Sequence, residues 1–358
     1  LYVEQGHKNA LLLAYQAFEL AQRLQMTDTL WGRVLLYLGI ALRDSGQREA
    51  YLQRCEEAID VFKASGDDDY YFRSLVNRAG EYIDWGNPNK ALADLFLIRD
   101  RCPSDQASAH VALNMASAYA DSDNLTNAEF YARKSVELYQ KLSVADKWGV
   151  YSAQVILGEI LKDKVVQRIR HNKDASEQFD EAETFLRAVL GELKAEYGDF
   201  HTARPSETDS EELIFAKENV AELHRIFAEL YIEYLHFQPA LLEDVDQELT
   251  LAEHLSSDAM DVGIASRILI MRARWLYIQH DNQAAYEKII TAEQHLVSQQ
   301  KQRELIPLKL LKAQILAAMV DIGAACRELK ETRRWMQEGI RPVYQQRVSE
   351  LQHEIGCN

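Results

Sequence analysis

One spacing recurs along this chain and limits the folds open to it. A small residue is followed three positions later by a larger apolar or aromatic residue. Twelve positions after the small residue a second segment begins its own series, in which mostly small or apolar residues are spaced by four and then three positions. A small residue on one helix lets a second helix approach closely, and the larger residues beside it fill the neighbouring space. The spacing therefore predicts repeated pairs of antiparallel helices, each with a helix A and a helix B. It starts at Gly39, Ala79, Ala116, Ala273 and Ala313 and leads to Tyr51, Ala91, Ala128, Ala285 and Ala325.

Parts of the pattern extend to further segments. Gly158 marks another helix A, but Ala182, which starts its helix B, lies 24 rather than twelve residues away. Near the start of the chain, alanines have the spacing of a helix B whose helix A we expect before the chain begins: Ala10, Ala14 and Ala17.

The turn between helix A and helix B also repeats. Gly46 and Gly86 follow Gly39 and Ala79 by seven residues, and glycine readily adopts the left-handed conformation that ends a helix. In the third pair we expect Asp123 and Asn124 to do the same, because these residue types tolerate that conformation.

Composition agrees with helices and excludes some function classes. The 358 residues include only 15 Gly and 6 Pro, fewer turn residues than a strand-rich fold needs. The net charge of −16 repels phosphate backbones, so we expect no nucleic-acid binding by this segment. We find no run of 18 apolar residues and no signal peptide, and expect a cytoplasmic protein without a membrane span. The scattered cysteines are expected to be reduced thiols: Cys55, Cys102, Cys326 and Cys357.

These motifs resemble the tetratricopeptide repeat, whose pattern is L-G-x2-Y in helix A and A-x3-F in helix B. The starting residues Gly39, Ala79, Ala116 and Gly158 are 40, 37 and 42 residues apart, and repeats of this length resemble arrays that precede the output domain of large bacterial regulators. The resemblance implies an all-α, right-handed superhelical solenoid of antiparallel helix pairs, about eight in number.

We expect one solenoid over residues 1–358, with regular repeats at 29–146 and 259–340. Residues 147–200 form a repeat with an insertion, and 201–258 an irregular repeat with an exposed loop at His201–Ser210 and helices at 211–236 and 240–256. We expect the helix at 211–236 to be amphipathic, with one apolar stripe: Leu213, Val220, Leu223, Phe227, Leu230 and Tyr234. A terminal helix at 341–358 carries Val348, Leu351 and Ile355 on one face. That face needs a partner, either the last repeat or the same helix of a second subunit in a homodimer.

No motif carries chemistry. The chain has no HExxH, GxGxxG, Walker A or GxSxG sequence, so we expect no catalytic residue, no bound metal and no cofactor.

The resemblance places helix A on the concave face. With the small residue counted as position 8, inward positions fall near 2, 5, 6, 9, 12 and 13. In peptide-binding members of the family, an asparagine at position 6 often holds the peptide backbone. The candidate ligand-binding residues are Asn77 and Asn114 at position 6, with Arg73 and His110 at position 2. The alternative is that this face is polar because it is solvated, and the paired lysines of a carboxylate clamp are absent.

The sequence thus predicts a non-catalytic domain that binds a protein or peptide. The leading hypothesis is the sensory or regulatory part of a bacterial signalling protein, whose partner is a ligand or its own output domain, a diguanylate cyclase or a transcription regulator. A free-standing adaptor is the alternative, and an enzyme that uses the concave groove is the third hypothesis.

Overall fold

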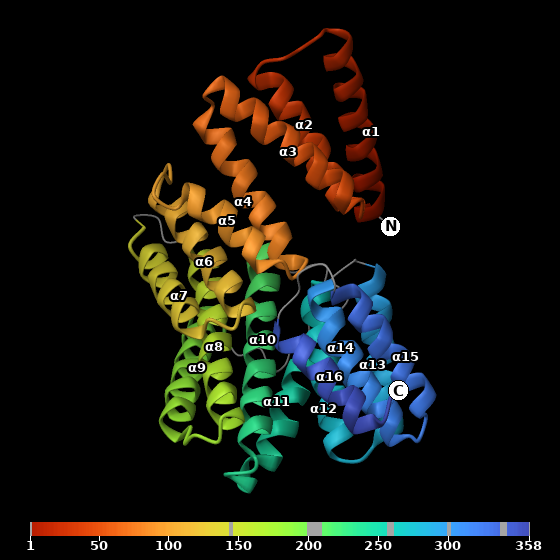
Figure 1. The fold of residues 1–358 in the computed structure, drawn as a ribbon. Helices are drawn as coiled ribbons and strands as arrows, with labels where there is room; N and C mark the ends of the chain where they lie inside the picture. Colours follow the sequence, from red (N-terminus) through yellow and green to blue (C-terminus); the bar gives the residue numbers. More distant parts are fainter. Residues whose placement is uncertain are drawn as a thin grey trace.

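The computed structural model describes residues 2–142, 146–198, 210–255, 261–298, 302–336 and 342–357. Within these ranges the regular structure is entirely helical (Figure 1). The helices are α1 (Tyr2–Arg23), α2 (Thr29–Asp44), α3 (Arg48–Ser65), α4 (Asp68–Asp84), α5 (Pro88–Ile98), α6 (Asp105–Asp121), α7 (Leu125–Gln140), α8 (Lys147–Arg170), α9 (Ser176–Tyr197), α10 (Glu211–Tyr234), the 3₁₀ helix η2 (Pro239–Leu241), α11 (Leu242–Leu255), α12 (Val262–Ile278), α13 (Asn282–Ser298), α14 (Gln302–Ala318), α15 (Ile322–Trp335) and α16 (Pro342–Ile355).

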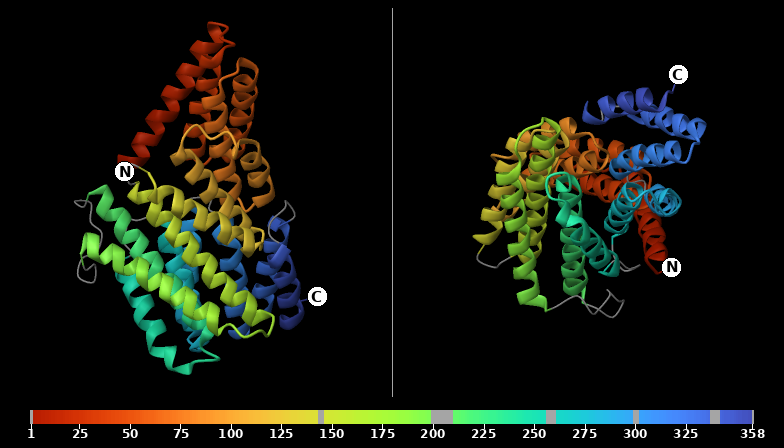
Figure 2. Two further views of the ribbon diagram at one scale, coloured as in Figure 1. Left: turned by 90° about the vertical axis from the view of Figure 1, so that its left-hand side faces the viewer. Right: turned by 90° about the horizontal axis from the view of Figure 1, so that it is seen from below.

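The helices form a solenoid of A and B pairs, as predicted. Each even-numbered helix from α2 to α14 is a helix A and packs against the helix B that follows it. Each pair also packs against the next pair, and the buried apolar residues form successive clusters along the array. The array curves (Figure 2), and α14 contacts α4 although more than 200 residues separate them. The helices A thereby line the inner face of the curve.

The predicted crossing residues are buried where helix A meets helix B. Gly39, Ala79, Ala116, Gly158, Ala273 and Ala313 are all buried. A Cβ atom on Gly39 would lie 3.3 Å from Cδ2 of Tyr51, and one on Gly158 would lie 2.5 Å from Cδ2 of Leu186. A larger side chain would separate the two helices at these crossings, which is why the repeat needs a small residue there.

The turn after helix A has one conformation in five repeats. The residue seven positions after the small residue has a positive φ each time, and glycine in the first two repeats meets that requirement without strain. In the third repeat Asp123 takes this conformation, whereas Asn124 caps α7 by accepting a hydrogen bond from the Asn127 backbone N–H. The φ values are 80° at Gly46, 68° at Gly86, 59° at Asp123, 64° at His280 and 66° at Val320.

The middle of the chain departs from the regular repeat. The extra residues between Gly158 and Ala182 lengthen α8 and α9 to 24 and 22 residues. The predicted helices at 211–236 and 240–256 are α10 and η2 with α11. The predicted exposed loop at His201–Ser210 lies outside the described residues except for Ser210, whose side chain caps α10.

One expectation for α10 is wrong. It is not a one-sided amphipathic helix, because α8, α9, α11 and α12 surround it and bury residues on all its sides. Polar side chains such as Lys217, Glu222 and Arg225 are therefore buried together with the predicted apolar stripe.

The C-terminal helix corrects the interpretation of the cysteines. Cys326 and Cys357 form a disulfide, so the prediction of reduced thiols is wrong for this pair, while Cys55 and Cys102 are free. The two residues are 31 positions apart, and only the return of α16 across α14 and α15 brings them together. Disulfides persist in oxidising compartments and are rare in the cytosol, so this bond does not support the expectation of a cytoplasmic chain.

The apolar side of α16 has its partner within the chain. Val348 and Leu351 are each 1% exposed and pack with residues of α14 and α15, and Ile355 packs against the same cluster. The last repeat therefore covers the stripe that was considered for a homodimer.

Candidate functional site

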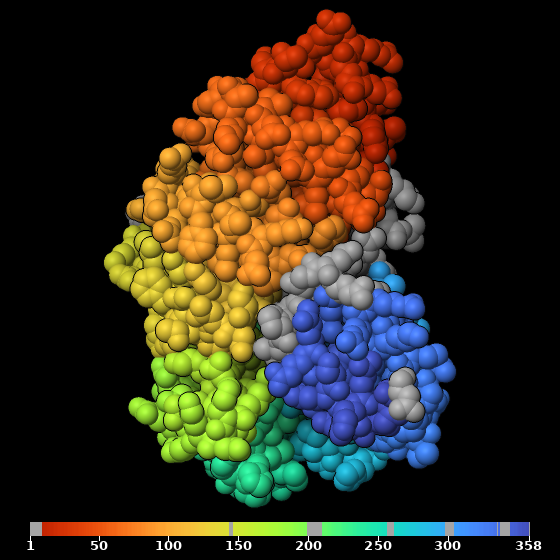
Figure 3. Space-filling view, in the orientation of Figure 1, coloured from red at the N-terminus to blue at the C-terminus, as the bar shows by residue number. Residues whose placement is uncertain are grey.

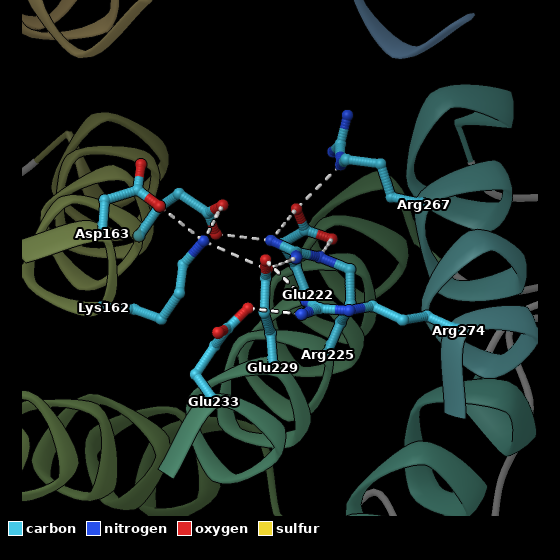
Figure 4. A network of polar contacts seen from close by, with 9 residues as sticks. Lys162, Asp163, Glu222, Arg225, Glu229, Glu233, Arg267 and Arg274 are labelled. Atoms are coloured by element: carbon cyan, nitrogen blue, oxygen red, sulfur yellow. Dashed lines mark hydrogen bonds and ion pairs between the residues drawn. The ribbon is translucent and has the colours of Figure 1, made fainter. Parts of the chain in front are cut away.

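The inner face of the solenoid has two unlike halves. We call the ion-pair network the charged side chains on the inner faces of α8, α10, α12 and α14: Glu159, Lys162, Asp163, Glu222, Arg225, Glu229, Glu233, Arg267, Arg274 and Glu304. Figure 4 shows the part of the network around Lys162 and Arg225. We call the N-terminal inner face the side chains at positions 2 and 6 of α2, α4 and α6, together with Tyr70: Arg33, Tyr37, Arg73, Asn77, His110 and Asn114.

Arg225 lies at the centre of the ion-pair network. Its side chain is 5% exposed, and its guanidinium contacts Glu159 of α8 at 2.5 Å and Glu222 and Glu229 of its own helix at 3.1 and 3.0 Å. Arg267 of α12 extends the network, because it lies 2.9 Å from Glu222 and 3.2 Å from Glu304 of α14. One connected set of charges therefore joins four consecutive helices A.

Lys162 and Arg274 complete the pairing. The Lys162 ammonium lies 3.0 Å from Glu159, 2.7 Å from Asp163 and 3.0 Å from Glu229. Arg274 reaches Glu233 at 2.5 Å and Glu229 at 3.7 Å. Because the cations already pair with carboxylates of the same chain, a ligand would have to break these ion pairs in order to bind there.

The carboxylates of the network do not all titrate alike. Burial raises the pKa of Glu159, but the neighbouring Arg225 and Lys162 outweigh it and hold that pKa below its usual range. Burial, together with Glu159 and Glu229, raises the pKa of Asp163 to about 6 against the opposing effect of Lys162. The pKa of Glu229 is also lowered, because the effect of Lys162, Arg225 and Arg274 outweighs burial. The pKa of Asp163 is therefore shifted in the opposite direction to those of Glu159 and Glu229.

The four predicted ligand-binding residues lie on neighbouring helices, as expected from the repeat. Arg73 and Asn77 lie one turn apart on α4, and His110 and Asn114 lie one turn apart on α6. Both asparagines are half-buried, and among the described residues neither side-chain amide makes a hydrogen bond. Within the described residues no hydrogen bond joins the two asparagines, so the structure places them on neighbouring helices without linking them. Their donors and acceptors remain available to a ligand.

Two arginines flank one tyrosine on the same surface. The Arg33 guanidinium carbon lies 4.9 Å and that of Arg73 5.5 Å from the centre of the Tyr70 ring. Within the described part of the chain, neither arginine is within ion-pair distance of a carboxylate, and the buried Nε of Arg33 has no hydrogen-bond partner. Two guanidiniums without an ion pair therefore lie against the same aromatic ring, in a chain whose net charge is −16.

The other side chains of this surface differ in what they offer to a ligand. Desolvation lowers the pKa of His110, against an upward effect of Asp146. Val76 and Leu113 are only 9% and 8% exposed and cannot supply apolar contact to a ligand. Tyr37, which is 53% exposed, is the aromatic surface available instead.

Sequence analysis missed the ion-pair network, although a signal for it was present. The position rule places Glu159, Lys162 and Asp163 at inward positions 9, 12 and 13 of their helix A, and Arg267 and Arg274 at positions 2 and 9 of theirs. Oppositely charged side chains at inward positions of successive repeats indicate pairing across the curve. Only the identity of each partner needed the structure.

Other kinds of site find little support in the described residues. A surface hollow between the start of α2 and the α3–α4 turn is lined by Thr29, Ser65, Gly66 and Asp67–Asp69, and does not include the four predicted residues. Within the described residues we find neither a group of His, Cys, Asp and Glu side chains placed to hold a metal ion nor a helix sufficiently long and apolar to cross a membrane.

Comparison with known proteins identifies no family. No family model matches the chain, and no curated protein matches it. A solved structure described as a circular tandem repeat protein with novel repeat topology and enhanced subunit contact surfaces aligns with 99% of this chain and 89% of its own, at 17% identity and a TM-score of 0.24. The low TM-score means that this likeness carries no argument about function.

Proposed function

We propose that this chain is a non-catalytic binding domain that holds an extended peptide segment of a partner protein on the N-terminal inner face. The observation that carries the proposal is the contrast between the two halves. In α8–α14 the inward charges pair with one another. On the N-terminal inner face, by contrast, the amides of Asn77 and Asn114 make no hydrogen bond and the guanidiniums of Arg33 and Arg73 make no ion pair among the described residues. Helical-repeat folds typically bind rather than catalyse, because their extended curved surface suits long ligands.

The geometry favours an extended peptide with acidic side chains. Packed helices lie about 8–10 Å apart, and an extended chain rises about 3.3 Å per residue. Asn77 and Asn114 are therefore spaced to meet backbone groups roughly three residues apart on one strand-like ligand. Arg33 and Arg73 offer guanidiniums for a carboxylate, and Tyr37 offers an aromatic surface.

We place the domain in a regulatory context on the strength of the repeat resemblance alone. The leading proposal is a regulatory or sensory array of a bacterial signalling protein that acts on its own output domain. A free-standing adaptor shares the same binding surface. Recovery of the full-length gene separates the two, because an adjoining enzyme or DNA-binding motif supports the regulatory array, and a gene that encodes the repeats alone supports the adaptor.

The binding proposal is tested with peptides selected from a random display library against the purified chain. Affinity of the selected peptides is then measured by calorimetry for the wild type and for the double variant Asn77→Ala/Asn114→Ala. Neutral hydrogen bonds contribute about 0.5–1.5 kcal/mol each, so the double variant should bind about 5–150-fold more weakly. Arg33→Met/Arg73→Met should weaken acidic peptides more than neutral ones.

The chain offers a matched control in Asn127→Ala. Asn127 is also half-buried, but it lies on α7, the helix B that pairs with α6. This substitution should leave affinity unchanged. If Asn77→Ala/Asn114→Ala and Asn127→Ala both fold and bind the selected peptides with equal affinity, the proposed binding surface is rejected. The N-terminal inner face would then be polar only because it is solvated.

A further inference from the structure

The first helix has two apolar faces, and only one is covered. Leu11, Ala14 and Phe18 pack against the core formed by α2–α5, and the Phe18 ring lies 5.2 Å from that of Trp31. The second face lies on the other side of α1 and continues past its end, and it is exposed: Ala10, Leu13, Ala17, Leu20 and Leu24. Leu13, Leu20 and Leu24 are 64%, 57% and 64% exposed, which is unusual for a run of leucines at helical spacing.

The repeat pattern identifies what this face corresponds to. Ala10, Ala14 and Ala17 occupy the three helix B positions that begin at Tyr51 in α3 and at Ala91 in α5. In six helices B these positions are at most 2% exposed: Tyr51, Cys55 and Ala58; Ala91, Leu95 and Ile98; Ala128, Ala132 and Ser135; Ala182, Leu186 and Val189; Ala285, Ile289 and Ala292; Ala325, Leu329 and Thr332. In α1, Ala10 and Ala17 are exposed and Ala14 is half-buried.

The helix that buries these positions elsewhere is the helix A of the same pair. A Cβ atom on Gly39 of α2 would lie 3.3 Å from the Tyr51 ring and 3.4 Å from Cβ of Arg54. Tyr51 and Arg54 are the counterparts of Ala10 and Leu13, 41 residues earlier. The exposed side of α1 is thus the side on which a helix A packs in the other pairs.

We propose that the face formed by Ala10, Leu13, Ala17 and Leu20 is the docking surface for one further helix A of the same array, antiparallel to α1. Its occupant is an amphipathic helix with a small residue opposite Ala10 and a larger apolar residue three positions later. The proposal does not depend on the peptide site of α4 and α6.

The C-terminal end of the array has the features of a capping helix. α16 buries Val348 and Leu351 and exposes polar residues such as Gln345, Ser349 and Glu350. Terminal repeats need a polar outer face of this kind for solubility. α1 presents leucines at the corresponding outer position, so it has the surface of an internal helix rather than of a cap. In the space-filling view the N-terminal helices (red) form the top of the molecule, and the C-terminal helices (blue) lie in its lower half (Figure 3).

The test supplies a helix A from this chain itself. A copy of residues Asp67–Asn87, which comprise α4 with its cap and turn, is fused ahead of His7, so that the copied Ala79 stands twelve residues before Ala10. The probe is this fused helix, and the measurements are amide hydrogen exchange in α1 and thermal unfolding. We expect exchange of α1 amides to slow about tenfold or more relative to the unfused chain, equivalent to about 1.4 kcal/mol, and the melting temperature to rise.

Two controls make the result specific. A fusion whose copied Ala79 is replaced by Glu should give no protection. Leu13→Gln/Leu20→Gln should leave the unfused chain folded, because both side chains are exposed, but should abolish the gain in the fusion. If the fused helix forms by circular dichroism and α1 gains no protection, the face does not accept a helix A. If the unfused chain sediments as a dimer that Leu13→Gln/Leu20→Gln dissociates, a second copy occupies the face and the proposal is wrong.

Discussion

Replacement of Arg225 by Met tests whether the ion-pair network holds the helices A of the second half together. Arg225 is 4% exposed and pairs with Glu159, Glu222 and Glu229. Methionine fills much of the same volume, so the main loss is the charge. Removal of one partner from a buried ion pair leaves uncompensated charge and costs about 3–5 kcal/mol. Lys162, Arg267 and Arg274 still contact these three carboxylates, which places the expected loss near 3 kcal/mol.

The matched control is Arg133→Met. Arg133 also pairs with two carboxylates, those of Glu129 and Glu181, but its side chain is 48% exposed. Exposed pairs contribute about 0.2–1 kcal/mol. We expect urea unfolding at pH 7, followed by circular dichroism, to separate the two variants by about 2 kcal/mol or more. Equal losses would show that the network is solvated and does not hold the helices together.

The loss of stability in Arg225→Met should also depend on pH. The pKa of Glu159 lies below its usual value in the folded chain because Arg225 and Lys162 outweigh its burial. A carboxylate whose pKa is lower in the folded chain than in the unfolded chain stabilises the fold at pH values above its unfolded pKa. This stabilisation is lost as the pH falls through the folded pKa. Without Arg225 the pKa of Glu159 moves up, because Lys162 alone opposes the effect of burial, and the carboxylate takes up a proton more readily as pH falls. The difference between wild type and Arg225→Met should therefore shrink between pH 7 and pH 4, and a constant difference would contradict the assignment.

Three further substitutions test the repeat geometry. Ala116→Leu should overpack the α6–α7 crossing, where Ala116 is 0% exposed, and cost about 1–3 kcal/mol in urea unfolding; wild-type stability would mean that the register is wrong for this repeat. Val320→Gly should stabilise the chain by about 1 kcal/mol, because Val320 has a φ of 66° with an 83% exposed side chain and left-handed backbone is costly for any residue but glycine; a lower melting temperature would refute this. Cys326→Ser/Cys357→Ser opens a loop of 31 residues and should lower stability by about 3–4 kcal/mol, a loss that a reductant should reproduce in the wild type only.

Sequence pattern was sufficient for the repeats because their packing is local. The twelve-residue offset from Ala79 to Ala91 reflects one crossing between neighbouring helices, and the turn glycines Gly46 and Gly86 mark a backbone requirement that is visible in residue type alone. The repeat register was unclear between Gly158 and Ala273, but the apolar pattern of 211–236 and its expected partner at 240–256 placed both helices within two residues. Burial on all sides of α10 was not predictable, because it depends on how four other helices surround it.

Contacts between distant segments account for the remaining differences. The Cys326–Cys357 disulfide requires α16 to return across two helices, and no spacing rule contains that path. The ion pair of Arg225 with Glu159 joins residues 66 positions apart. Their two repeats do not follow the regular spacing of the others, so the sequence alone does not align these positions. By contrast, Asn77 and Asn114 lie in neighbouring repeats with one register, and they were placed on neighbouring helices A correctly.

The claim that the inner face is divided into a paired half and an open half is tested most directly by photo-crosslinking. An acidic peptide selected against the chain is made with one photoreactive residue and irradiated in the complex, and the attachment sites are mapped by mass spectrometry. We predict crosslinks in α2, α4 and α6, and their loss in Asn77→Ala/Asn114→Ala at the same peptide concentration. Crosslinks concentrated in α8, α10 and α12, which carry the ion-pair network, would contradict this account.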